Sequence, residues 1–140
     1  MQYANKVIWK SEKKGNLKIE GKPDLEIATP PEFGGHKGIL SPEDLFVASL
    51  NACTLSTFLS FAERTKTKFT SFECTAEGTL EKKEGQLQFT RIVLTPRVDV
   101  PSEKEKNHAL HALALVDKYC LVTHSMRCDV EMNPEVTVVY

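Results

Sequence analysis

The sequence predicts an α+β protein, because stretches of alternating apolar residues stand before, between and after two stretches with helical signals. Short alternating runs separated by glycine-centred turns fill the first 28 residues, residues 45–62 carry no charge, and a second helical pattern follows Pro101. The order strands, helix, strands, helix, strand is typical of α+β folds. A chain of 140 residues is long enough for one core, so we expect residues 1–140 to form a single domain.

Composition narrows the possible partners. Hydrophobic residues make up 41% and charged residues 26%, and the net charge of -1 comes from interleaved signs. We therefore expect neither a nucleic acid nor a membrane as the main partner.

The first residues lack a signal-peptide pattern, so we expect a cytoplasmic protein. Its four cysteines, which form no CxxC pair, are then expected to be free thiols: Cys53, Cys74, Cys120 and Cys128.

The first 28 residues predict antiparallel strands. Tyr3, Val7 and Trp9 share one phase, and residues 17–20 and 25–27 alternate apolar and charged side chains. Turns are expected at residues 14–16 and 21–24, each of which contains a glycine. Residues 29–40 are a glycine-rich loop without the GxxxxGK[ST] pattern, so phosphate binding is not expected there.

A strong helix start follows at residues 41–44. Ser41 suits the N-cap, Pro42 the first helical position, and Glu43 and Asp44 complement the positive end of the helix. The uncharged residues 45–62 reach the minimum length of a membrane span, but six of these eighteen residues are Ser, Thr or Asn. We therefore expect a helix buried on all sides, with the interface of a homodimer as its second cover.

The second half predicts a long hairpin, a helix and a final strand. Alternation over residues 72–100 turns at residues 84–86, and the return strand changes phase between Phe89 and Ile92, which indicates a bulge. Ser102 then starts a helix with apolar residues at helical spacing, and a short irregular or helical piece follows Cys120. Residues 127–132 alternate again and predict the last strand.

The cysteines are the strongest candidates for chemistry. Cys53, within the uncharged helix, is either a buried apolar thiol or a reactive one, and reactivity requires a lowered pKa. Cys120 leaves the same two possibilities, since a helical turn after it would stabilise its thiolate. Cys74 and Cys128 lie on apolar strand phases and are expected to be inert. His108 and His111 stand three apart, but without zinc-type spacing elsewhere we expect no metal site.

Three segments together resemble the OsmC/Ohr family of osmotically inducible and organic hydroperoxide resistance proteins. Residues 41–53, SPEDLFVASLNAC, resemble the family signature in which a Pro-Glu helix start precedes a cysteine ten residues after the glutamate. Residues 30–35, PPEFGG, resemble the loop before that helix, and residues 118–122, KYCLV, resemble the second cysteine segment of the OsmC-like branch. The predicted order of strands and helices also matches this family along the whole chain.

The resemblance implies an activity and a site. It implies an intertwined homodimer with antiparallel sheets around a central helix, and a stress-response peroxidase that reduces organic hydroperoxides at the dimer interface without a cofactor. It assigns Cys53 as the peroxidatic cysteine, Cys120 as the resolving cysteine, and Glu43 as the glutamate that helps to hold an active-site arginine. The disulfide would be recycled by a dithiol or a lipoylated protein.

One departure from the family leaves a second function open. Hydroperoxide-reducing members place the arginine in the N-terminal strands, whereas the first arginine here is Arg64. Only Lys13, Lys14 and Lys18 stand in that region, and a lysine lacks the planar fork of a guanidinium. The alternative is a dimer of the same fold that binds a small ligand or thiol without significant peroxidase activity.

Overall fold

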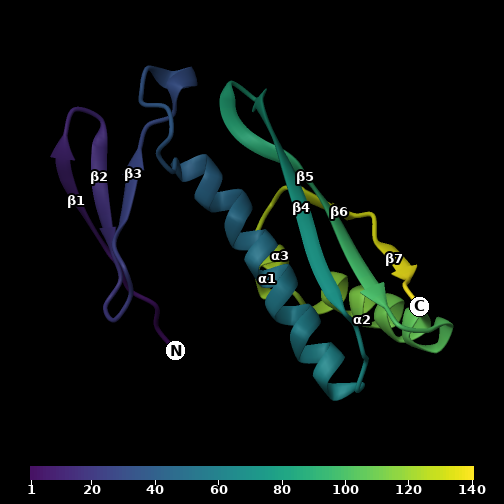
Figure 1. Cartoon of the computed structure of the whole chain (residues 1–140). Coiled ribbons are helices and arrows are strands. Elements are labelled where there is room, and N and C mark those ends of the chain that lie inside the picture. The colour runs from purple at the N-terminus through teal and green to yellow at the C-terminus, as the bar shows by residue number, and fades with distance from the viewer. The chain divides into compact units, whose positions relative to one another are not determined.

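The computed structural model describes residues 1–140 and divides them into two compact units, Met1–Phe46 and Val47–Tyr140. The first unit holds three strands and a short 3-10 helix, η1 (Pro31–Phe33); the second holds four strands and helices α2 and α3 (Figure 1). Helix α1 (Pro42–Arg64) begins in the first unit and continues in the second. The predicted α+β class is confirmed.

The N-terminal sheet is antiparallel in the order β1 (Lys6–Ser11), β2 (Lys14–Lys18), β3 (Leu25–Ala28). The turn predicted at residues 14–16 was wrong, since Glu12 and Lys13 make the first turn and Glu12 adopts a positive φ of 50°. Gly15 lies inside β2 instead, where an added Cβ would stand 3.0 Å from the Ile8 carbonyl oxygen. This glycine allows close approach of two strands; it does not mark a turn.

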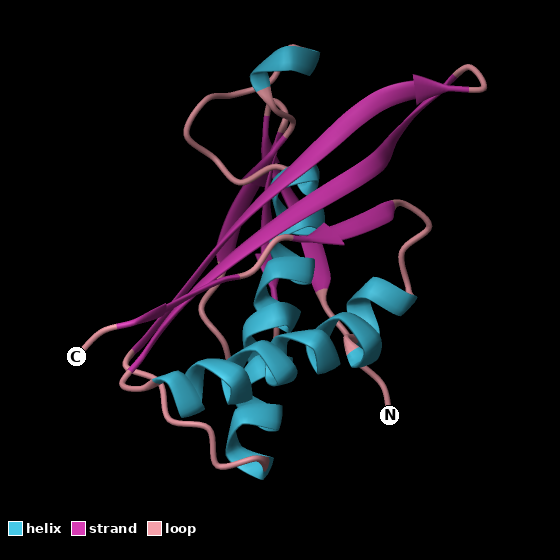
Figure 2. Cartoon of the chain, turned by 90° about the vertical axis from the view of Figure 1, so that its right-hand side faces the viewer, coloured by secondary structure: helices cyan, strands magenta, loops and turns pink.

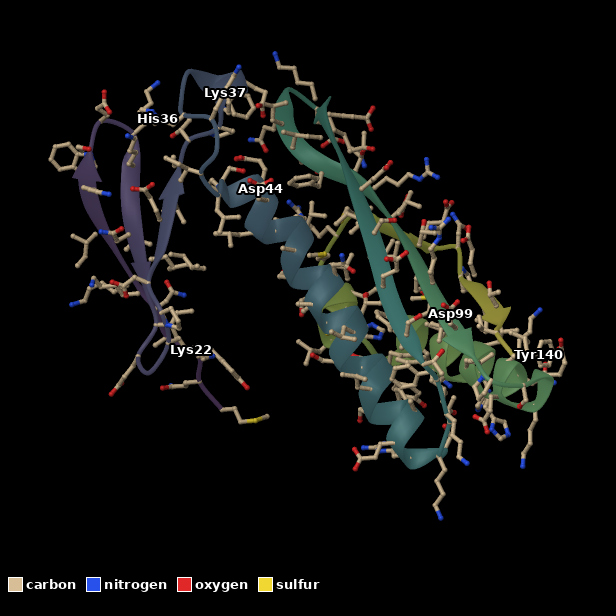
Figure 3. All side chains as sticks on the ribbon, viewed as in Figure 1. Lys22, His36, Lys37, Asp44, Asp99 and Tyr140 are labelled. Carbon is tan, nitrogen blue, oxygen red and sulfur yellow. The ribbon has the colours of Figure 1, made fainter.

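Helix α1 begins as the sequence predicts. The Ser41 hydroxyl accepts a hydrogen bond from the Asp44 amide (3.1 Å), and the Asp44 carboxylate accepts one from the Ser41 amide (3.0 Å). Figure 3 labels Asp44 at this end of the helix. By length and composition α1 could cross a membrane.

Helix α1 is not buried on all sides by the chain alone, and the dimer interface expected as its second cover stays a prediction. Its buried residues recur every four positions and form one face, made of Leu50, Thr54, Phe58 and Ala62. Leu55 and Leu59, on another face, remain 40% and 44% exposed. The chain by itself therefore covers α1 on one side only.

The larger sheet is built on a long hairpin of β4 (Ser71–Lys83) and β5 (Gln86–Val100). Thr79 pairs with Arg91 and Leu80 with Phe89, so Thr90 is an extra residue and the predicted bulge is confirmed. Strands β6 (Asp129–Met132) and β7 (Glu135–Val138) both run parallel to β5. The sequence analysis did not predict β7.

The break between β6 and β7 has a cause in the partner strand. β6 pairs with β5 as far as Leu94, and β7 resumes pairing at Arg97. Pro96 lies between these positions, and a proline has no amide hydrogen to donate to a neighbouring strand. One long strand on this edge is therefore replaced by two short ones.

Helices α2 (Glu103–Tyr119) and α3 (Leu121–His124) complete the second unit (Figure 2). The Ser102 hydroxyl caps α2 by accepting from the Glu105 amide at 3.3 Å, and α2 begins where the sequence predicts a helix. Leu110 is 38% exposed, and the buried apolar residues of α2 are Ala109, Ala112, Leu113 and Val116. The core unites α1, α2 and one face of the sheet through Leu50, Phe58, Ile92, Leu94, Val98, Ala109, Leu113 and Val116.

Candidate active site

Two cysteines from distant parts of the chain meet in the second unit. Cys53 lies in α1 and is partly exposed, whereas Cys120, 1% exposed, is the single residue between α2 and α3. The two side chains are hydrogen-bonded to each other, and both are free thiols. The turn from α2 into α3 thus brings Cys120 beside the helix that carries Cys53.

The surroundings of Cys53 favour its thiolate. Burial acts first and raises the pKa of this thiol, but four hydrogen bonds outweigh it and the net pKa is lowered. The donors are the Cys120 thiol, the Val122 amide, the Thr57 hydroxyl and the Leu121 amide. The two amides are free to donate because the first N–H groups of a helix have no partner within it. Cys53 therefore meets the requirement for a reactive cysteine.

The environment of Cys120 has the opposite effect. Burial raises its pKa most, the hydrogen bond to Cys53 raises it further, and the thiolate charge of Cys53 adds to this. Contacts with the hydroxyl and amide of Thr123 lower the pKa but do not outweigh the rest. When the pair loses a proton, these opposite pKa shifts favour the negative charge on Cys53 and the remaining proton on Cys120.

The other two thiols lie in unreactive surroundings. Burial raises the pKa of Cys74, on β4, to about 11, against an opposing contact with the Thr95 backbone. Burial also raises the pKa of Cys128, just before β6, and the charge of Asp129 adds to this. Both pKa shifts favour the protonated thiol, which is a poor nucleophile.

Glu43 lies in the first turn of α1, within the first unit. Its Oε2 atom is buried and has no hydrogen-bond partner. The three N-terminal lysines are engaged with other groups of their own unit. Lys13 donates to Gly34 O at 3.0 Å, Lys14 lies 3.6 Å from Glu12, and Lys18 lies 2.7 Å from Asp24.

Three of the groups that lower the pKa of Cys53 were not predicted from the sequence. Thr57 stands four residues after Cys53, and helical i,i+4 spacing could have identified it. The amides of Leu121 and Val122 leave no trace in the sequence, because every residue except proline has the same group. The structure contains no cluster of three or more His, Cys, Asp or Glu side chains that could hold a metal ion.

Comparisons with known proteins agree with this fold. A family model described as OsmC-like protein matches residues 34–135. An uncharacterised protein from Methanocaldococcus jannaschii is 32% identical over 120 residues, which cover 84% of this chain and 59% of that protein. The chain therefore spans about three fifths of the length of this relative.

Solved structures show the same architecture. An OsmC-like protein of unknown function from Vibrio cholerae superposes with a TM-score of 0.87 at 21% identity, covering 96% of this chain and 99% of that one. An organic hydroperoxide resistance protein OsmC from Legionella pneumophila gives a TM-score of 0.71 at 22% identity, with 98% of each chain covered. At these identities the likeness concerns the fold, and it confirms the expected arrangement of sheets and long helix.

Proposed function

Because the chain belongs to the OsmC family, we propose that it is a thiol-dependent peroxidase that reduces organic hydroperoxides. One observation carries the proposal: two thiols in contact have pKa values shifted in opposite directions, down for Cys53 and up for Cys120. A peroxidatic cysteine must be a thiolate to attack, and a resolving cysteine can remain protonated until it is needed. The similar structure from Legionella pneumophila is named an organic hydroperoxide resistance protein, and this name supports the proposal by analogy.

In the first step the Cys53 thiolate attacks the terminal oxygen of the hydroperoxide R–O–OH. A sulfur–oxygen bond forms, the oxygen–oxygen bond breaks, and its electron pair leaves with RO⁻, which takes a proton to become the alcohol. Cys53 is oxidised to a sulfenic acid and the peroxide is reduced. The hydrogen bonds to Cys53 hold the thiolate in place for this attack.

In the second step Cys120 attacks the sulfur of the Cys53 sulfenic acid. A disulfide forms, and the hydroxyl leaves as water with the proton that the Cys120 thiol gives up. An external dithiol, for which we propose a lipoylated protein of the cytoplasm, then restores both thiols by exchange. The existing contact between the two thiols means that the disulfide needs little movement of the chain.

Exposed apolar groups beside the thiols support an organic substrate. Tyr119 and Leu121, the two neighbours of Cys120 in the chain, are 53% and 70% exposed. The Leu121 amide faces Cys53, so this residue lies at the reacting sulfur. An alkyl or aryl group on the hydroperoxide could cover these side chains, whereas hydrogen peroxide could not.

Peroxide consumption with a dithiol reductant tests the proposal. We expect the wild-type protein to consume cumene hydroperoxide faster than hydrogen peroxide, and Cys53→Ser to abolish turnover. Cys120→Ser should still form a sulfenic acid that a trapping reagent detects, but it should not cycle through a disulfide. Wild-type turnover no higher than that of the double variant would refute a peroxidase.

We further propose that a second copy of the chain covers the open side of α1. Ala48, Asn51, Ala52 and Leu55 line a shallow groove of about 320 Å³ against β4, and Leu59 continues its apolar side. Replacing Leu59 by Lys should release monomers in sedimentation equilibrium, because a charge would have to be buried without a partner. A wild-type monomer at micromolar concentration would contradict the dimer.

A second function is favoured by the missing N-terminal arginine, beside which the Glu43 Oε2 atom has no hydrogen-bond partner. In this alternative the chain is a dimer of the OsmC fold that binds a small ligand or thiol at the cysteine pair. Incubation with a small disulfide would then give a stable mixed disulfide at Cys53, while hydroperoxide is not consumed. Rapid hydroperoxide turnover would exclude this alternative.

A further inference from the structure

The threonines of α1 use their hydroxyl groups in two different ways. Thr54 donates to the backbone carbonyl four residues earlier at 2.9 Å, as threonines within helices commonly do, and Thr65, just after the helix, does the same at 2.8 Å. The Thr57 hydroxyl instead meets the sulfur of Cys53, four residues earlier, at 3.7 Å. Thr57 is thus the threonine of this helix whose hydroxyl reaches the reacting atom.

We propose that Thr57 is a further catalytic residue, whose hydroxyl donates a hydrogen bond to the Cys53 thiolate and holds it for attack on the hydroperoxide. This inference rests on the peroxidase proposed above. A thiolate has no proton, so a hydroxyl beside it can act only as the donor. Thr57 is half-buried, which keeps water from replacing its hydrogen bond freely.

The other groups around Cys53 make this hydrogen bond important. The leading groups that favour its thiolate are neutral: a thiol, two backbone amides and the Thr57 hydroxyl. A thiol is a weak donor, and the amides are fixed by the backbone of α3. Thr57 is therefore the oxygen donor at this sulfur that a point substitution can remove without changing the backbone.

The hydroxyl has two opposing effects on the rate. It increases the fraction of Cys53 present as thiolate, and a hydrogen bond to a charged group changes such a fraction by about tenfold. It also lowers the intrinsic nucleophilicity of that thiolate, by about threefold for a tenfold change in basicity. At pH values where most Cys53 is protonated the first effect prevails, so the hydroxyl speeds the reaction about threefold.

Alkylation of Cys53 by iodoacetamide, followed against pH, separates these effects. We expect Thr57→Val to react about threefold more slowly on the acidic limb and about threefold faster on the alkaline plateau, so that the two profiles cross. Thr57→Ser keeps the hydroxyl and should follow the wild-type profile. Thr54→Val removes a hydroxyl from the same helix that bonds only a carbonyl, and it should also match the wild type.

The outcomes distinguish this inference from the peroxidase proposal, because alkylation needs no hydroperoxide. A crossed profile supports the Thr57 contact even if the wild type consumes no hydroperoxide, in which case the peroxidase alone is refuted. An unchanged profile for Thr57→Val in a protein that turns over hydroperoxide overturns the role of Thr57. A rate that falls on both limbs, without rescue by Thr57→Ser, would show a structural role and also overturn it.

Discussion

The structure predicts which of the four thiols reacts first with an alkylating reagent. At pH 7 a thiol with the pKa of about 11 given to Cys74 is a thiolate in about one molecule in ten thousand. An unperturbed thiol with a pKa of 9.0 is a thiolate in about one molecule in a hundred, and Cys53 lies below that value. The thiolate fraction of Cys53 therefore exceeds that of Cys74 by at least about a hundredfold.

Intrinsic reactivity offsets part of this difference. A less acidic thiol gives a stronger nucleophile, and over two pKa units the gain is about six- to tenfold. Cys53 should therefore react at least about ten times faster than Cys74. Cys128 and Cys120 also have raised pKa values, and Cys120 is almost completely buried, so neither should compete.

The test is one equivalent of iodoacetamide at pH 7, followed by mass mapping of the labelled peptides. We expect about nine tenths of the label on Cys53, and Cys53→Ser should slow total labelling about tenfold. Cys74→Ser is the matched control, because it removes a thiol of the same unit and should leave the rate unchanged. Labelling of Cys74 at a rate within threefold of Cys53 would refute the reasoning.

Three further substitutions test the core of the second unit, a loop of the first unit and the short helix α3. Phe58→Ala should lower the free energy of unfolding by about 3–5 kcal/mol in chemical denaturation, because the centroid of this unexposed ring lies 4.9 and 5.2 Å from the centroids of two other aromatic rings. A loss below about 1 kcal/mol would contradict its place in the core. Gly35→Ala should cost about 1–3 kcal/mol, since the new Cβ would overlap the Thr29 carbonyl oxygen, and an unchanged melting temperature would argue against this loop geometry. His124→Ala removes a 2.6 Å hydrogen bond from Nε2 to the carbonyl of Lys118. Because this loosens α3, whose amides contact Cys53, alkylation of Cys53 at pH 7 should slow about threefold. An unchanged rate would show that α3 is held by other contacts.

Local signals predicted the elements of the fold well. The cap at Ser41, the start of α2 after Ser102 and the bulge at Thr90 all depend on residues close in sequence, and all three are confirmed. The first turn was misplaced because a glycine was taken to mark it, whereas Glu12 supplies the positive φ there. Strand β7 was not predicted, although residues 135–138 alternate in the same way as the four residues of β6.

The candidate site was predictable only in part. The cysteines could be recognised as chemical groups, but their roles came from the family resemblance, because spacing alone does not show that Cys53 and Cys120 meet. Thr57 could have been found from helical spacing. The backbone amides of α3 could not, since they depend on how Leu121 and Val122 are placed and not on what they are.

The missing arginine is less decisive for Cys53 than the family comparison suggests. A cation lowers the pKa of a nearby thiol through its charge, but neutral donors have the same direction of effect when they are fixed in a partly buried place. Here the net shift of Cys53 is downward although its leading donors are neutral, and Lys13 and Lys18 are engaged within the first unit. The lowered pKa of Cys53 is therefore explained by neutral hydrogen-bond donors, without a charged residue among the leading groups. The leading groups that lower the pKa of Cys53 all lie within Val47–Tyr140.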